Sequence, residues 1–156
     1  MKKLKWFFKN FEEVSGAVLL LSMALLAFVN VLTRYFIHYS LASTEELEVS
    51  SMVFLTMIGA SAAFKKNQHL RLMFLDSKVS DKTRFGLNLF SLVLSFILFG
   101  VIAFLSYFHL KDEIDLNITT EALDIPEWIY VMAIPLGSIL INIRIVQKII
   151  ELFKER

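Results

Sequence analysis

The chain has 156 residues, of which 56% are hydrophobic and 20% are charged. This is more apolar than a soluble domain, in which about 45–50% of residues are apolar. With 16 Lys and Arg against 15 Asp and Glu, the formal net charge is +1, which argues against a disordered chain and against a nucleic-acid-binding protein. The sequence contains no Cys, which excludes a disulfide scaffold, an iron–sulfur site and a thiol nucleophile.

Four stretches without Asp, Glu, Lys or Arg dominate the sequence. Residues 14–33 and 85–110 form runs of 20 and 26 residues, and residues 49–64 and 128–143 form runs of 16 each. A helix needs about 20 mostly apolar residues to cross a hydrocarbon core of ~30 Å, so the two shorter runs must recruit flanking residues whose charged ends reach the interface. One 16-residue run could be a buried helix of a soluble protein, but a chain of this size could not cover four such runs. We therefore predict an all-α membrane protein in which residues 1–156 form a single membrane domain with four transmembrane helices, at about 14–37, 45–64, 85–108 and 126–150.

Lys and Arg residues are distributed unequally between the segments that connect these runs. The N-terminal segment, the segment between the second and third runs, and the C-terminal end together carry 14 of the 16 basic residues, and only Arg34 and Lys111 fall on the other side. Because cytoplasmic segments carry the excess of Lys and Arg, both termini are predicted to be cytoplasmic.

Residues 2–13 precede the first run and have a pattern of their own. Leu4, Phe7, Phe8 and Phe11 share one helical face, and lysines occupy the rest. This pattern is typical of an amphipathic helix that lies in the headgroup region. A simple cytoplasmic extension of the first transmembrane helix fits the pattern equally well, and both interpretations stay open.

Charged and polar residues meet near the outer ends of the first two predicted helices. Asn30 and Arg34 are four residues apart and share one helical face. Residues 43–46, Ser-Thr-Glu-Glu, fit the S-x-x-E capping box that opens a helix. An intramembrane charge is expected to have a partner, so the alternative role of these acidic residues is that Glu45 or Glu46 pairs with Arg34 at the same depth.

Small residues and prolines indicate further structural positions. Gly59 and Ala63 have the small-xxx-small spacing that favours close approach of two helices. Pro126 is suited to the first position of the fourth helix. Pro135 lies inside that helix and removes a backbone donor, which predicts a kink.

Nothing in the sequence indicates catalysis. The three histidines, His38, His69 and His109, lie at the ends of the predicted spans and on different sides, and no Asp or Glu lies in the middle of a span. There is no metal-ligand spacing, phosphate-binding glycine loop or Ser/His/Asp set. These absences disfavour an enzyme, a haem-bearing anchor and a stand-alone carrier. They favour a partner subunit of a membrane complex, with no catalytic, cofactor or metal site in this chain.

A series of short motifs extends over most of the chain, and it resembles a known family. The motifs are Asn30-Val31-x-x-Arg34-Tyr35, Glu45-Glu46-Leu47, Gly59-Ala60, His69, Ile125-Pro126-x-Trp128 and Ile134-Pro135-Leu136-Gly137. In this order and spacing they resemble the small membrane subunit of tripartite ATP-independent periplasmic (TRAP) transporters, the DctQ-like family.

The resemblance implies a small permease subunit in the bacterial inner membrane. Such a subunit binds a large multi-span membrane subunit, which holds the substrate and sodium sites. A periplasmic binding protein delivers the substrate, a carboxylate such as a C4-dicarboxylate or a sialic acid. The alternative is a membrane anchor subunit of an unrelated multi-subunit complex.

The resemblance also assigns roles to residues of this chain. Structural or interface roles are expected for Asn30, Arg34, Glu45, Glu46, Gly59, His69, Pro126 and Pro135, and the first four of these would hold the first two helices together. The acidic outer connector would dock the periplasmic protein through Asp112, Glu113 and Asp115.

Overall fold

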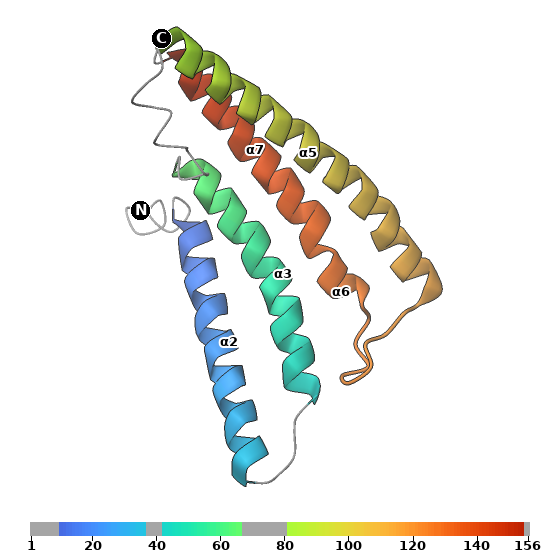
Figure 1. Ribbon diagram of the computed structural model, residues 1–156. Coiled ribbons are helices and arrows are strands. Elements are labelled where there is room, and N and C mark those ends of the chain that lie inside the picture. The colour runs from blue at the N-terminus through green and yellow to red at the C-terminus, as the bar shows by residue number, and fades with distance from the viewer. Residues whose placement is uncertain (1–9, 37–41, 67–80, 155–156) are drawn as a thin grey trace, which may run out of the picture.

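The computed structural model describes residues 10–36, 42–66 and 81–154. Their helices are α2 (Phe11–Phe36), α3 (Ala42–Lys65), α5 (Asp81–Leu116), α6 (Trp128–Val131) and α7 (Ala133–Lys154) (Figure 1). Four helical segments, residues 11–36, 42–65, 83–116 and 128–154, are long and apolar enough to cross a membrane, which confirms the predicted all-α class and the four candidate spans. Most of the predicted interfacial helix at residues 2–13, and also His69, lie outside the described residues.

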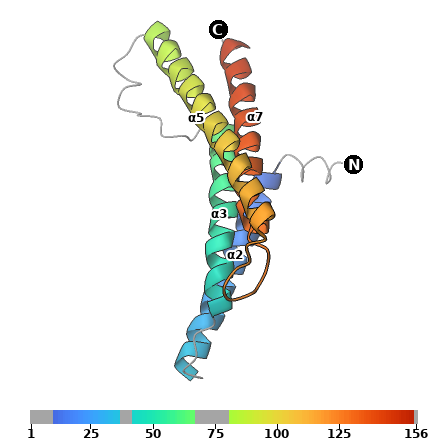
Figure 2. The same cartoon turned by 90° about the vertical axis from the view of Figure 1, so that its right-hand side faces the viewer.

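The helices form a single layer rather than a closed bundle. Helix α2 packs on α3, α3 packs on α7, and α7 packs on α5, so the order in space is α2, α3, α7, α5. Figure 1 shows this row from its broad side, and Figure 2 shows it at right angles. Helices α2 and α5 are the two edges of the layer, and large side chains such as Phe28 and Phe104 are about 60% exposed there.

The small apolar core lies where α7 meets its two neighbours. Ile141 and Ile145 of α7 are fully buried and form a cluster with Phe64 of α3. Phe99 of α5 packs against this cluster, with its ring edge-to-face to that of Phe64 at 6.1 Å. Because a single layer of helices has two open faces, the remaining apolar surface must be covered by lipid or by another protein.

Helix α5 is longer than the predicted third span. It continues to Leu116, whereas the predicted span ends at about residue 108. Its 36 residues correspond to about 54 Å at 1.5 Å per residue, which exceeds the ~30 Å hydrocarbon core. The first part of the expected acidic connector is therefore helical, and the connector itself is limited to residues 117–127.

The fourth span begins later than predicted and is interrupted. Helix α6 starts at Trp128, whereas Pro126 forms an isolated β-bridge with Thr119, so the prediction that Pro126 is the first helical residue was wrong. The helix is interrupted at Met132, between α6 and α7. Pro135 cannot donate to the carbonyl of Val131, the last residue of α6, and this missing hydrogen bond explains where the interruption lies.

Close approach of α3 and α7 depends on Gly137 rather than on Gly59. A Cβ atom placed on Gly137 would lie 2.5 Å from Cβ of Met57, whereas one placed on Gly59 would meet nothing within 4 Å. Gly59 is exposed. Within the described residues, the small-xxx-small face predicted at Gly59 and Ala63 is therefore not the face that brings two helices of this chain together.

Candidate functional site: a buried polar cluster that joins three helices

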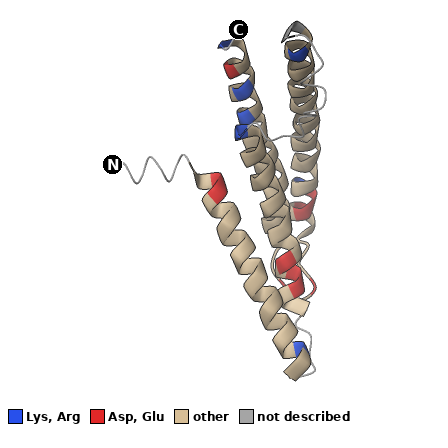
Figure 3. Cartoon of the chain, turned by 60° about the vertical axis from the view of Figure 1, so that its left-hand side comes forward, with Lys and Arg blue, Asp and Glu red and all other residues tan. Residues whose placement is uncertain are grey.

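Charged residues are concentrated toward the two ends of the layer (Figure 3). We call the end that carries Lys65, Lys66, Arg144 and Lys154 the basic end. The opposite end, with Glu45, Glu46 and the 117–127 connector, is the acidic end. The middle of each long helix is free of charge in sequence, so the chemistry of the described residues is concentrated at these two levels.

At the basic end, the Glu12 carboxylate is buried between three helices and is only 2% exposed. Its Oε1 accepts hydrogen bonds from Arg144 Nε at 2.7 Å and from Ser61 Oγ at 2.8 Å. Its Oε2 lies 3.2 Å from Lys65 Nζ. Glu12 belongs to α2, Ser61 and Lys65 to α3, and Arg144 to α7, so one carboxylate connects three helices.

Glu13 extends this cluster toward the surface. Lys65 Nζ donates to both of its carboxylate oxygens, at 3.0 and 3.2 Å, and Lys66 Nζ lies 3.6 Å from Oε1. The side chain of Glu13 is 25% exposed, against 2% for Glu12. We refer to Glu12, Glu13, Ser61, Lys65, Lys66 and Arg144 as the Glu12 cluster; at neutral pH it holds two carboxylates and three cations.

Each helix presents its members of the cluster through local features of its sequence. Glu12 and Glu13 lie in the first turn of α2, where a negative charge also interacts favourably with the helix dipole. Ser61 and Lys65 are four residues apart and so lie on one face of α3. A buried carboxylate is costly unless it is paired and hydrogen-bonded. The first turn of α2, the last turn of α3 and the middle of α7 are therefore held in defined relative positions.

Sequence reasoning missed Glu12. Lys65 and Arg144 entered the sequence analysis only among the basic residues that predict the orientation and among the flanking charges that extend the two shorter runs. The available signal was that two acidic residues interrupt an otherwise basic N-terminal segment directly before the first apolar run. Acidic residues in a predicted cytoplasmic segment are candidates for ion pairs with the Lys and Arg residues that follow the other apolar runs.

The expected pair between Arg34 and Glu45 or Glu46 does not form among the described residues. Arg34 is exposed in the last turn of α2, where it can reach the interface. Glu46 instead accepts a hydrogen bond from the backbone N–H of Ala122 at 2.9 Å, and so links α3 to the 117–127 connector. Ser43 lies in the first turn of α3, whose described residues begin at Ala42, so it is not the residue that precedes the helix.

The expected docking residues of the acidic end divide into two groups. Asp112 and Asp115 are exposed, whereas Glu113 is 7% exposed. Glu113 Oε1 lies 3.8 Å from Nε2 of His109, one turn earlier in α5. Glu113 is thus part of the interior of the acidic end rather than of a docking surface. No group of three His, Asp or Glu side chains suited to a metal ion occurs within residues 10–36, 42–66 and 81–154.

Comparison with known proteins identifies the family. The family described as "Tripartite ATP-independent periplasmic transporters, DctQ component" matches residues 23–155. The small permease protein SiaQ of a sialic acid TRAP transporter from Vibrio cholerae is 23% identical over 154 residues, which cover 99% of this chain and 88% of SiaQ.

Two proteins of Haemophilus influenzae are also similar. A putative TRAP transporter small permease protein is 32% identical over 79 residues, 51% of this chain and 49% of that protein. The sialic acid TRAP transporter permease protein SiaT is 27% identical over 143 residues, 90% of this chain but 23% of SiaT. Four membrane-spanning candidates and a family match over most of the chain lead to one conclusion: this chain belongs to the DctQ family and is a multi-pass, non-enzymatic small permease subunit of a TRAP transporter.

Proposed function

We propose that this chain is a non-catalytic scaffold for a large membrane subunit in sodium-coupled uptake of a carboxylate. The carboxylate would be of the C4-dicarboxylate or sialic acid type, delivered by a periplasmic binding protein. The observation that carries the proposal is the open layer of helices. Large apolar side chains are exposed along its two edge helices, α2 and α5. A layer of this kind can widen a membrane complex, because it offers surface to a partner without enclosing a path of its own.

The relatives support a large partner. Both SiaQ and SiaT carry sialic acid TRAP transporter in their names, and this chain covers only 23% of SiaT. In SiaT, a segment similar to this chain is therefore part of a much longer permease polypeptide. We infer that this chain works with a corresponding large permease. Sodium would bind to that permease.

The Glu12 cluster supports a rigid role. It joins the first turn of α2 and the last turn of α3 to the middle of α7, and the Phe64–Ile141–Ile145 core joins α3 to α7 beside it. A scaffold must keep its own shape while its partner moves, and buried polar contacts of defined geometry restrict such relative motion.

Reconstitution tests the proposal directly. Proteoliposomes would contain this chain alone, the large subunit alone, or both, with an inward sodium gradient and the binding protein loaded with labelled sialic acid or succinate. We expect uptake from the pair only, and no uptake when the binding protein or the sodium gradient is omitted. Saturable uptake by this chain alone, or full uptake by the large subunit alone, would refute a scaffold role.

We also propose that both termini are cytoplasmic, because basic residues concentrate at the end of the layer that carries the C-terminus. The native chain has no Cys, so single-cysteine labelling needs no background substitutions. With intact spheroplasts, a membrane-impermeant maleimide should label Asp115→Cys and not Lys154→Cys. Labelling of the reverse pair would invert the orientation.

A further inference from the structure

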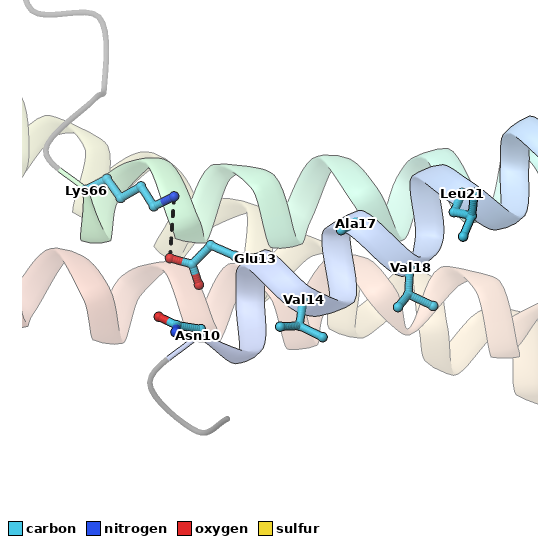
Figure 4. A pocket seen from close by; sticks show the side chains of 7 residues that line it. All are labelled: Asn10, Glu13, Val14, Ala17, Val18, Leu21 and Lys66. Atoms are coloured by element: carbon cyan, nitrogen blue, oxygen red, sulfur yellow. Dashed lines mark ion pairs between the residues drawn. The ribbon is translucent and has the colours of Figure 1, made fainter. Parts of the chain in front are cut away.

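A groove of about 590 Å³ runs along the first three turns of α2 (Figure 4). One face of α2 forms its floor, through residues that recur at helical spacing from Asn10 to Leu21. The groove is hollow because Val14, Ala17 and Val18 are small side chains in the middle of that face. Lys66, directly after α3, forms the wall at one end, where its side chain points toward Glu13.

The groove is polar at one end and apolar along the rest. Asn10, Glu13 and Lys66 line the end next to the Glu12 cluster, and the lining from Val14 to Leu21 is entirely apolar. From Asn10 to Leu21 the helix rises about 16 Å at 1.5 Å per residue. Half of a ~30 Å hydrocarbon core is about 15 Å, so the groove is about as long as one leaflet of hydrocarbon.

The polar end of the groove is lined by one carboxylate, Glu13, and one cation, Lys66, and it adjoins the Glu12 cluster, which has an excess of positive charge. The Glu12 cluster holds three cations and two carboxylates, and the strong pairs use Lys65 and Arg144. Lys66 makes the longest of these contacts, 3.6 Å to Glu13, and its side chain is 49% exposed. An ammonium has three donors, so Lys66 can bind an additional anionic oxygen while it remains near Glu13.

We propose that this groove is a binding site for one phospholipid molecule of the leaflet at the basic end. The phosphate accepts a hydrogen bond from Lys66, and one acyl chain lies along Val14, Ala17 and Leu21. Glycerophospholipids have this arrangement of groups, an anionic phosphate joined to a chain about one leaflet long. An apolar transmembrane helix of a partner would match the apolar part but would supply no second anionic oxygen to Lys66, whose side chain is 49% exposed beside Glu13.

Native mass spectrometry of the full-length chain tests the site. The protein is delipidated in detergent and then titrated with phosphatidylglycerol or phosphatidylethanolamine. We expect one tightly retained phospholipid per chain. Lys66→Gln should weaken retention about fivefold, the effect of one lysine near a membrane surface, and Ala17→Phe should abolish retention because the ring fills the groove.

Matched controls separate this site from general lipid adhesion. Lys154→Gln removes a basic-end lysine away from the groove, and Ala27→Phe enlarges an exposed residue of α2 beyond it; both should retain lipid as the wild type does. Circular dichroism and the unfolding midpoint show that the variants fold. Equal retention by wild type, Lys66→Gln and Ala17→Phe would overturn the proposal. So would loss of large-subunit co-purification in Ala17→Phe with lipid retention unchanged, because the groove would then be a protein contact.

Discussion

Substitution of Glu12 tests whether the buried cluster holds the helices together. In Glu12→Ala, Arg144 Nε and Ser61 Oγ lose the acceptor that they share at 2.7 and 2.8 Å, and Lys65 loses one of its two carboxylate neighbours. Removing one member of a buried ion pair costs about 3–5 kcal/mol. The side chains of Arg144 and Lys65 are 24% and 20% exposed, so they can be partly rehydrated. We therefore expect a loss of about 2–3 kcal/mol in the free energy of unfolding.

The control is the neighbouring glutamate. Glu13 has the same charge and the same helix, but its side chain is 25% exposed and it bonds only to lysines. Glu13→Ala should cost no more than about 1 kcal/mol, as for exposed ion pairs. The free energy of unfolding of both variants is measured in bicelles, where the chain remains in a bilayer-like phase.

A double-mutant cycle completes the test. Because Arg144→Ala removes the cation that Glu12 neutralises, Glu12→Ala should cost less in the Arg144→Ala background than in the wild type, with a coupling of about 1–2 kcal/mol. If Glu12→Ala is no more harmful than Glu13→Ala, or if the two losses simply add, the contact contributes little to stability and the reasoning from burial is wrong.

Three further predictions concern packing, the acidic end and docking. Gly137→Ala should lower the free energy of unfolding by about 1–3 kcal/mol, because the new Cβ would lie 2.5 Å from Cβ of Met57. Gly59→Ala should have little effect, because its Cβ would meet nothing within 4 Å. Thermal unfolding of both variants in one detergent tests this prediction, and similar midpoints would contradict it. Arg34→Ala and Glu46→Gln should be additive within about 0.5 kcal/mol in a double-mutant cycle, because Glu46 bonds to Ala122 and no ion pair joins it to Arg34 among the described residues; a clear coupling would mean that the pair forms in the membrane. Charge reversal at the exposed Asp112 and Asp115 should slow binding-protein-dependent uptake up to about tenfold at low salt and less at high salt, with assembly of the complex unchanged. Charge reversal of the exposed Glu151 at the basic end is the control. Equal uptake by both variants would exclude docking through these aspartates.

Local features of the acidic end show where sequence patterns mislead. The S-x-x-E pattern at Ser43 fits a capping box, yet α3 begins at Ala42. A helix continues upstream of a capping pattern when its surroundings favour it, because a cap is worth only about 1 kcal/mol. Similarly, Glu113 resembles its neighbours in sequence but is buried, because it lies on the same face of α5 as the buried Ser106, seven residues earlier, whereas Asp112 and Asp115 are exposed.

The choice of packing glycine shows the same limit. Gly59 and Gly137 both lie in apolar helices next to small residues. Only the crossing of α3 and α7 distinguishes them. It brings the backbone at Gly137 against Met57, whereas a Cβ atom added to Gly59 would meet nothing within 4 Å. The rotation of a helix about its own axis depends on its neighbours, and a hydrophobic run that is apolar on all sides carries little information about that rotation.

The amino-acid sequence by itself determined that this chain is helical, that it has four segments able to cross a membrane, and that its motifs match one transporter family. The reason is that the cost of burying charges in hydrocarbon acts on each segment separately and can be read from runs of residues. Only the tertiary structure decided that the helices form an open row in the order α2, α3, α7, α5, and that Glu12 meets Arg144 across 132 positions of the chain. Such contacts depend on which helices become neighbours, and apolar helices in a membrane find their neighbours by shape and by a few polar side chains rather than by their overall hydrophobicity.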